Sequence, residues 1–73
     1  SYKDQREYDS LPQELEELEV QIDELNACLS DPSCYEQKGI VAVSQELEEL
    51  KNNYETRVER YLELEEIIES FNA

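Results

Sequence analysis

Residues 11–29 read LPQELEELEVQIDELNACL, and this stretch decides the fold. Its apolar residues recur at alternating steps of four and three: Leu11, Leu15, Leu18, Ile22, Leu25 and Leu29. A mean spacing of about 3.5 residues places these side chains on one narrow stripe of a helix. Most positions between them hold Glu, Gln, Asp or Asn. Because such a stripe is not stable when it faces water, the rest of the chain must cover it.

Local signals predict that this first helix covers about residues 12–30. Ser10 and Gln13 have the spacing of a capping box, which satisfies the free backbone groups at a helix start. Pro12 falls in the first turn, where no backbone N–H is needed. The segment before it, residues 1–10, is predicted to be an N-terminal strap.

Residues 31–39 are predicted to form the turn after this helix. Pro32 holds Asp31 away from helical geometry, so the helix must end before it. Asp31 is also placed to cap one short helical turn, with Tyr35 folded inward to fill the tip. Gly39 is the only glycine of the chain, and it marks the end of the connection.

A second helix is predicted over about residues 40–71, because a second stripe follows the turn. Its members also alternate in steps of three and four: Ile40, Val43, Leu47, Leu50, Tyr54, Arg57, Tyr61, Leu64, Ile68 and Phe71. Two helices joined by so short a connection fold back antiparallel. The sequence therefore predicts an all-α fold, a two-helix antiparallel coiled-coil hairpin over residues 11–73. The expected register puts Leu11 opposite Tyr61, with a slip of about half a heptad as the alternative.

The second predicted helix extends past the reach of the first. Two explanations remain open for its uncovered apolar end. The strap of residues 1–10 packs there through Tyr2 and Tyr8, or a second molecule covers it in a symmetric dimer. The dimer contact would comprise Leu64, Ile67, Ile68 and Phe71.

Composition agrees with long helices and limits the partners. The chain has 73 residues, one Gly and 36% charged residues. Twenty acidic residues against six basic ones give a net charge of −14, which opposes general binding to nucleic acid or to an anionic membrane. No apolar run approaches the roughly 18 residues of a membrane span, so no membrane contact is expected. Because the chain contains no Met, we expect a fragment of a larger protein or a processed product.

The residue types argue against catalysis within this chain. It contains no His, which excludes nucleophile–His pairs and makes a zinc site improbable. Gly-rich phosphate loops are absent, and the many Glu side chains of a coiled coil face solvent rather than a pocket. We therefore expect no enzyme activity, no cofactor and no metal in this domain. Cys28 and Cys34 are expected to be reduced thiols near the turn, with a disulfide between them as the alternative.

Most of the basic residues gather at one end of the predicted hairpin. Four of the six lie there, interleaved with tyrosines: Lys3, Arg6, Arg57 and Arg60. Aromatic and basic side chains together can stack on bases and contact phosphates. The alternative interpretation is that the tyrosines belong to the core and the arginines pair with nearby Glu side chains.

The N-terminal half resembles a known family. SYKDQRE at residues 1–7, followed by LP at residues 11–12 and an acidic leucine helix, resembles the start of the C-terminal coiled-coil domain of Uup-like ABC-F ATP-binding cassette ATPases. LSDP at residues 29–32, with Tyr35, is similar to the tip of that family's hairpin. The resemblance spans the whole chain and is most specific over residues 1–18.

The resemblance implies a cytoplasmic parent protein with two cassettes that bind ATP and Mg, and with no membrane domain. This chain would follow the second cassette as a non-catalytic accessory domain that contributes to binding of DNA or ribosomal RNA. Lys3, Arg6, Arg57 and Arg60 would be its local contacts, although the acidic net charge departs from that role. The alternatives are a coiled coil for protein–protein interaction or dimerisation, contact with the cassettes of the same chain, and a simple spacer.

Overall fold

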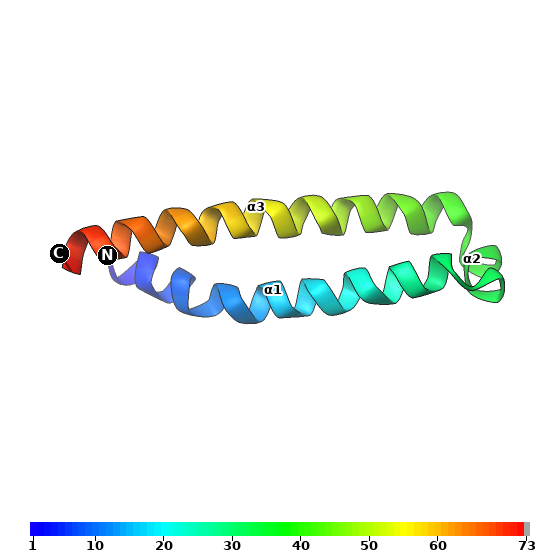
Figure 1. The fold of residues 1–73 in the computed structure, drawn as a ribbon, viewed down its shortest axis with the longest axis horizontal. Helices are drawn as coiled ribbons and strands as arrows, with labels where there is room; N and C mark the ends of the chain where they lie inside the picture. The colour runs from blue at the N-terminus through cyan, green and yellow to red at the C-terminus, as the bar shows by residue number, and fades with distance from the viewer. Residues whose placement is uncertain (73) are drawn as a thin grey trace.

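The computed structural model describes residues 1–72, and all of its regular structure is helical. Helix α1 spans Tyr2–Leu29, α2 spans Pro32–Lys38 and α3 spans Ile40–Asn72. The two long helices lie antiparallel in a rod of 53 × 16 × 15 Å, with α2 at the tip and both termini at the opposite end, the base (Figure 1). The predicted hairpin with a short helical turn at its tip is confirmed. Ala73, the last residue of the predicted hairpin, lies outside the described residues.

The predicted start of the first helix was wrong, because α1 already begins at Tyr2. Ser1 is the N-cap, and its hydroxyl accepts a hydrogen bond of 3.2 Å from the Asp4 backbone N–H. Ser10 lies inside the helix, where its hydroxyl donates to the Glu7 carbonyl at 3.1 Å. Helices in proteins are stabilised mainly by the face that they pack. The contacts that residues 1–11 make with α3 therefore outweigh the local start signal at Ser10.

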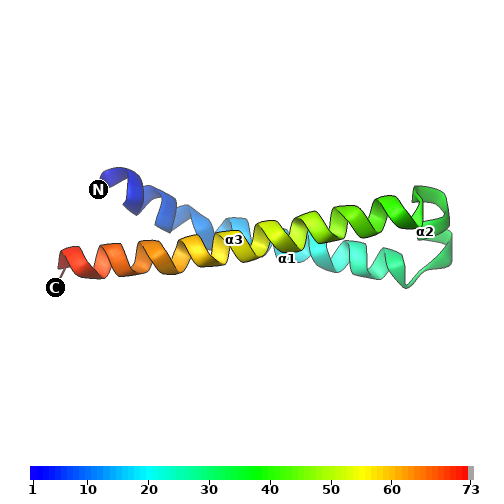
Figure 2. The same cartoon turned by 90° about the horizontal axis from the view of Figure 1, so that it is seen from above.

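Pro12 consequently lies inside α1 rather than at its first turn. Proline has no N–H to donate to the carbonyl one turn earlier, and its ring crowds that carbonyl, so it bends a helix. In Figure 1 the blue N-terminal turns of α1 slant towards α3 relative to the rest of the helix, and in Figure 2 they diverge from the line of α3. The base of the hairpin is therefore built from a helix segment with its own direction.

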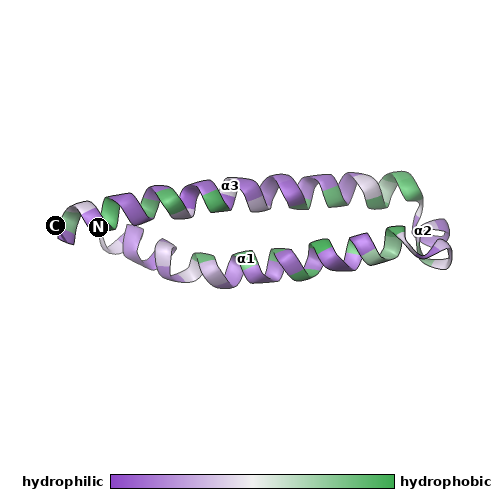
Figure 3. Cartoon of the chain, in the orientation of Figure 1, coloured by the Kyte–Doolittle hydropathy of each residue, from purple (hydrophilic) through white to green (hydrophobic). Residues whose placement is uncertain are grey.

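The core near the tip follows the predicted stripes. Leu25, Cys28, Val43 and Leu47 are buried in one cluster, against which Tyr35 packs from α2. The inward position of Tyr35 is as predicted, and Leu25 of α1 lies in the same cluster as Val43 and Leu47 of the opposite long helix. Hydrophilic residues cover most of both long helices, and the hydrophobic residues form separate bands (Figure 3). No helix among residues 1–72 is long and apolar enough to cross a membrane.

The turn is built as the sequence predicts. Asp31 has extended backbone angles, and its carboxylate accepts from the Ser33 N–H at 3.1 Å as the N-cap of α2. Gly39 ends α2 with a φ of 91°, a value that L-residues with a side chain rarely adopt. Because only glycine adopts this angle readily, α3 can begin immediately at Ile40.

The two cysteines differ from the expectation of reduced thiols. Cys28, in the last turn of α1, forms a disulfide with Cys34 in α2, and their Cα atoms lie 5.2 Å apart. The short sequence separation favoured free thiols. The turn at Asp31, however, brings α2 back over the end of α1, at a distance that a disulfide requires.

At the base the register differs from the prediction by three residues. Tyr61 stacks on Tyr8, three residues before its predicted partner Leu11, which corresponds to the half-heptad slip considered as the alternative. Leu11 and Leu64 are the fully buried side chains of this end, with 1% and 0% of their surface exposed.

Candidate functional site

Arg60 is the centre of a polar network at the base, where the sequence predicted basic residues for ligand contact. Its Nε donates to Glu7 Oε2 at 2.9 Å and its Nη2 to Glu7 Oε1 at 3.1 Å, which makes a two-pronged contact across the hairpin. Nη1 donates to Glu63 Oε1 at 2.9 Å, and Asp4 Oδ1 lies 3.7 Å from Nη2. Paired hydrogen bonds between guanidinium and carboxylate are strong and directional. Arg60 therefore joins α1 to α3.

The charges of this network shift each other's proton affinity. The hydrogen bond from Arg60 holds the pKa of Glu7 below its ordinary value of 4.5, against the opposing effect of partial burial. The same hydrogen bond, helped by the charge of Glu63, raises the pKa of Arg60. Glu7 and Arg60 therefore remain an ion pair at neutral pH.

Arg57 makes a second polar contact across the hairpin, nearer the middle of the rod. Its Nη1 donates to Glu14 Oε2 at 3.1 Å, and its Nε donates to Asn53 Oδ1 at 3.1 Å within α3. About two-fifths of each side chain of this ion pair is exposed, so solvent weakens the attraction. Arg57 is thus oriented by protein groups, as the alternative interpretation of the arginines predicts.

Tyr8 and Tyr61 follow Glu7 and Arg60 directly in sequence and form a third contact across the hairpin. Their ring centroids are 4.7 Å apart at an angle of 13°, and their hydroxyl oxygens share a hydrogen bond of 3.2 Å. This hydrogen bond raises the pKa of Tyr8 to about 12, with further contributions from partial burial and from the negative charges of Glu65 and Glu69. The stacked pair belongs to the packing between the helices, as the alternative interpretation of the tyrosines predicts.

Lys3 and Arg6 remain exposed on the first turns of α1. The Arg6 guanidinium carbon lies 5.7 Å from the centre of the Tyr2 ring, which is 78% exposed. This distance is typical of a cation–π contact. Tyr2 therefore does not pack on α3, and the structure separates the four predicted basic residues into two kinds. Arg57 and Arg60 face carboxylates, whereas Arg6 lies against the exposed Tyr2 ring and Lys3 is exposed, with its charge acting on Glu7.

The residues predicted for a dimer contact also differ in how far they are buried. Leu64 is fully buried within the hairpin itself, so it offers no surface to a second molecule. Ile67 and Ile68 are half-buried, and Phe71 is 77% exposed. Of these four residues, Phe71 in the last turn of α3 is therefore the exposed one.

Glu7 and Asp4 are the important residues that sequence reasoning missed. Asp4 belongs to a continuation of the stripe, since Tyr8 lies three residues before Leu11 and Asp4 lies four before Tyr8, and Glu7 lies beside the stripe, four residues before Leu11. That spacing indicated a longer first helix, but the start signals around Ser10 and Pro12 obscured it. The choice of Glu7 as the partner of Arg60 also depends on the shifted register at the base.

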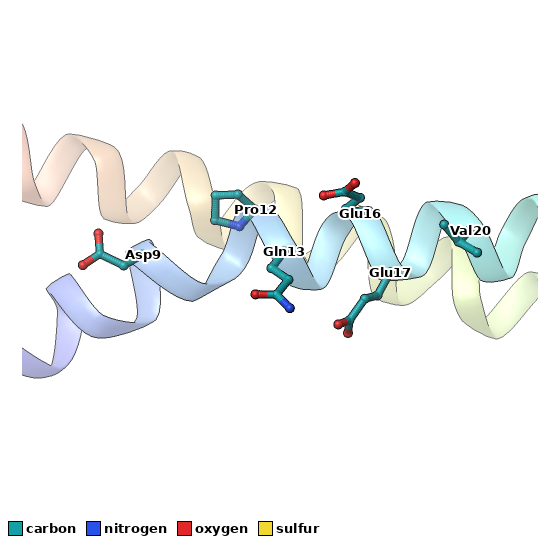
Figure 4. A pocket seen from close by; sticks show the side chains of 6 residues that line it. All are labelled: Asp9, Pro12, Gln13, Glu16, Glu17 and Val20. Carbon is teal, nitrogen blue, oxygen red and sulfur yellow. The ribbon is translucent and has the colours of Figure 1, made fainter.

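The outer face of α1 offers a shallow hollow away from the base contacts. Its lining residues are Asp9, Pro12, Gln13, Glu16, Glu17 and Val20, all from α1 (Figure 4). The side chains project outward and carry three carboxylates without a basic group among them. Within residues 1–72, no group of His, Cys, Asp and Glu side chains is arranged to hold a metal ion. The hollow is a solvated acidic surface.

Comparison with known proteins agrees with the resemblance seen in the sequence. A family model described as ABC transporter C-terminal domain matches residues 1–66. A protein named ATP-binding protein Uup-like, from Haemophilus influenzae, is 43% identical over 68 residues, which are 90% of this chain and 15% of that protein. ATP-binding protein Uup of the same organism is 43% identical over 68 residues, 90% of this chain and 10% of that protein.

These relatives are much longer than the aligned segment, so the chain spans only a small part of their length. No solved structure matches the chain. The predicted relation to Uup-like ATP-binding proteins is confirmed by the family match and by both relatives. The chain belongs to the ABC transporter C-terminal domain family.

Proposed function

We propose that this chain is a non-catalytic accessory arm of a cytoplasmic ABC ATP-binding protein, and that its base contacts DNA or ribosomal RNA through Lys3 and Arg6. The observation that carries the proposal is the exposed contact of Arg6 with the Tyr2 ring, with exposed Lys3 on the same first turns of α1, at the end of an acidic rod. Basic groups next to an exposed aromatic ring suit a phosphate backbone and an unstacked base. The family relation supports the role of an accessory domain.

Arg57 and Arg60 have a different part in this proposal from the one that the sequence suggested. Both guanidinium groups donate to carboxylates across the hairpin, so they hold α1 on α3. They fix the position of the first turns of α1, which carry Lys3 and Arg6. Replacing either arginine would therefore disturb the packing of α1 on α3, and would affect a phosphate contact only through that change.

The acidic remainder of the rod limits where nucleic acid approaches. With a net charge of −14, the chain repels phosphates over most of its surface. A contact confined to one end therefore directs the arm with its tip pointing away from the nucleic acid. This geometry fits a positioning arm better than a general nucleic-acid clamp.

The test is fluorescence anisotropy with labelled duplex DNA and with an RNA hairpin, using the protein that carries this domain. The variant is the double substitution Lys3→Gln and Arg6→Gln. Loss of two phosphate contacts should weaken binding and reduce the slope of log affinity against log salt by about two. The matched control is Lys38→Gln with Lys51→Gln, the same charge change near the tip and along α3.

Equal effects of the two double variants would contradict the proposed site, because they would show a response to net charge alone. If both nucleic acids bind equally well with and without Lys3 and Arg6, the proposed contact is also wrong. A selective loss for only one nucleic acid would identify which of DNA and RNA the base prefers.

Self-association is the second candidate function, and the exposure of Phe71 favours it. Phe71 is 77% exposed at the end of α3, next to the half-buried Ile67 and Ile68. Such a patch is typical of a contact with another apolar surface. Sedimentation equilibrium of the wild type and of Phe71→Ser tests it. A concentration-dependent dimer that Phe71→Ser abolishes would support this role, and a monomer at high concentration would exclude it.

A further inference from the structure

The disulfide at the tip joins two elements of very different burial. Cys28 is 5% exposed and belongs to the buried cluster with Leu25, Val43 and Leu47. Cys34 is only half-buried and packs against that cluster from α2. One sulfur atom is therefore inside the core of the tip, while the other belongs to a residue that solvent reaches.

Few other interactions hold α2 in place. The helix has seven residues, and none of them is buried. The Cys34 and Tyr35 N–H groups donate to the Asp31 carbonyl at 2.9 and 3.1 Å, and the Gly39 N–H donates to the Tyr35 carbonyl at 2.8 Å. These hydrogen bonds are local to the turn. The contact of Tyr35 with the cluster and the disulfide are what tie α2 to the long helices.

We propose that Cys28 and Cys34 form a reversible thiol–disulfide site for small thiols of the glutathione class, and that its oxidation state sets how firmly α2 is held on the tip. Disulfides in reducing compartments are rare, and those present are commonly redox-sensing. The assignment to such a compartment rests on the proposed function, whereas the chemistry and the test below do not. Failure of nucleic-acid binding would leave this proposal untouched.

The exchange has a defined order. A glutathione thiolate attacks Cys34 Sγ, the S–S bond breaks, and Cys28 leaves as a thiolate that takes up a proton. A second glutathione thiolate attacks the glutathione sulfur of the mixed disulfide, which releases oxidised glutathione and the Cys34 thiolate, in turn protonated. Two glutathione molecules are oxidised and one protein disulfide is reduced. Attack begins at Cys34 because its residue is the accessible one.

Reduction should loosen the tip without affecting the base. A disulfide that closes a loop this short limits the conformations of the opened tip. It therefore lowers the equilibrium constant for opening by a factor of roughly ten to fifty. Without it, α2 opens more often and exposes Leu29 and Tyr35, which now pack on the cluster. Ile40 and Val41, exposed at the start of α3, lie immediately after this segment. The oxidised tip is therefore closed and the reduced tip presents a larger apolar surface.

The test compares the wild-type protein in glutathione buffers from fully reduced to fully oxidised. Free thiols are alkylated and counted by intact mass, and amide hydrogen exchange is followed by NMR. Both thiols should disappear together as the buffer becomes oxidising. The amides of Cys34, Tyr35 and Gly39 should exchange about ten to fifty times faster in the reduced form, while amides around Leu64 keep their rates.

Three results would overturn the proposal. The thiols could stay free in fully oxidised glutathione, the tip amides could exchange equally in both states, or the amides around Leu64 could change as much as those of the tip. The order of attack has its own test in two single variants. Cys28→Ser, which leaves Cys34, should form the mixed disulfide with oxidised glutathione readily. Cys34→Ser, which leaves the buried Cys28, should form it slowly, and the reverse order would contradict attack at Cys34.

Discussion

At the tip of the hairpin, apolar side chains join α1 to α3 and a disulfide joins α1 to α2, whereas at the base charged and aromatic side chains cross between the two long helices. The tip cluster consists of Leu25, Cys28, Val43 and Leu47. The base relies on the ion pair of Arg60 with Glu7, the stacked tyrosines, and two fully buried leucines. The two ends of the rod are therefore stabilised by different kinds of contact.

Because the contacts at the two ends are of different kinds, the tip and the base should respond differently to pH and salt. Apolar packing near the tip depends on the repeat of the stripe and is indifferent to pH. The base depends on individual partners, and its polar contacts respond to protonation and to salt. Because the proposed contact residues Lys3 and Arg6 lie on the first turns of α1, their position depends on the base contacts.

The largest effect is expected from Leu64→Ala at the base. Leu64 is completely buried, and truncation of such a leucine costs about 2–5 kcal/mol. The core of so small a domain rarely supplies more than about 3–5 kcal/mol, so the variant should lose most of its stability. Urea unfolding followed by circular dichroism measures it. Leu62→Ala is the control on the same helix, where Leu62 is 56% exposed and a change within about 0.5 kcal/mol is expected.

Similar losses for the two leucine variants would show that the base is not packed as described. A loss for Leu47→Ala at the tip that clearly exceeded that for Leu64→Ala would reverse the comparison. The tip would then be the part that stabilises the rod, with the base as a frayed end.

The hairpin and its tip could be predicted from the sequence because their signals are local or periodic. The three–four alternation gave both long helices, Pro32 and Asp31 gave the turn, and Gly39 gave the start of α3. The first turns of α1 were missed because the capping signals at Ser10 and Pro12 are local, while the contacts that override them come from α3.

The partners at the candidate site could not be predicted for a different reason. The sequence offers twenty acidic residues as partners for Arg60, and the pairing with Glu7 depends on the register at the base, where Tyr61 stacks on Tyr8 rather than three residues further along α1. The disulfide likewise depends on the distance between Cys28 and Cys34, which only the path of the turn decides. Which side chains meet across two helices can be predicted only when the register is known. The stripe fixes the register only to within half a heptad.

An intermediate effect is expected from Gly39→Ala at the tip. The φ of 91° is strained for alanine and should cost about 1–3 kcal/mol. A Cβ at this position would come no closer than 4.0 Å to Ala42 Cβ, so the cost lies in the backbone and not in crowding. Thermal unfolding by circular dichroism measures it. Lys38→Ala, an exposed neighbour in α2, should change stability little, and equal losses for both variants would exclude backbone strain as the cause.

The smallest effect is expected from Glu7→Gln, and it should depend on pH. Arg60 lowers the pKa of Glu7 below 4.5 in the folded chain, so the folded state binds this proton more weakly than the unfolded state. The carboxylate therefore stabilises the fold above its unfolded pKa, and this stabilisation is lost as the pH falls through the lower folded pKa. The urea midpoint of Glu7→Gln should lie below that of the wild type at neutral pH, and the gap should close under acidic conditions.

The test depends on the difference in urea midpoint between the wild type and Glu7→Gln, and not on the midpoint of either protein alone. A chain with a net charge of −14 loses internal repulsion when acid protonates its carboxylates, so both proteins should become more stable on that account. Glu59→Gln is the matched control, since Glu59 is an exposed carboxylate next to Arg60 in sequence and the chemical change is the same. It removes a repelling charge and should not lower the midpoint at neutral pH. A gap for Glu7→Gln that persisted below the folded pKa of Glu7 would mean that the charge of this carboxylate does not hold the base, which would leave the stacked tyrosines and the buried leucines to position Lys3 and Arg6.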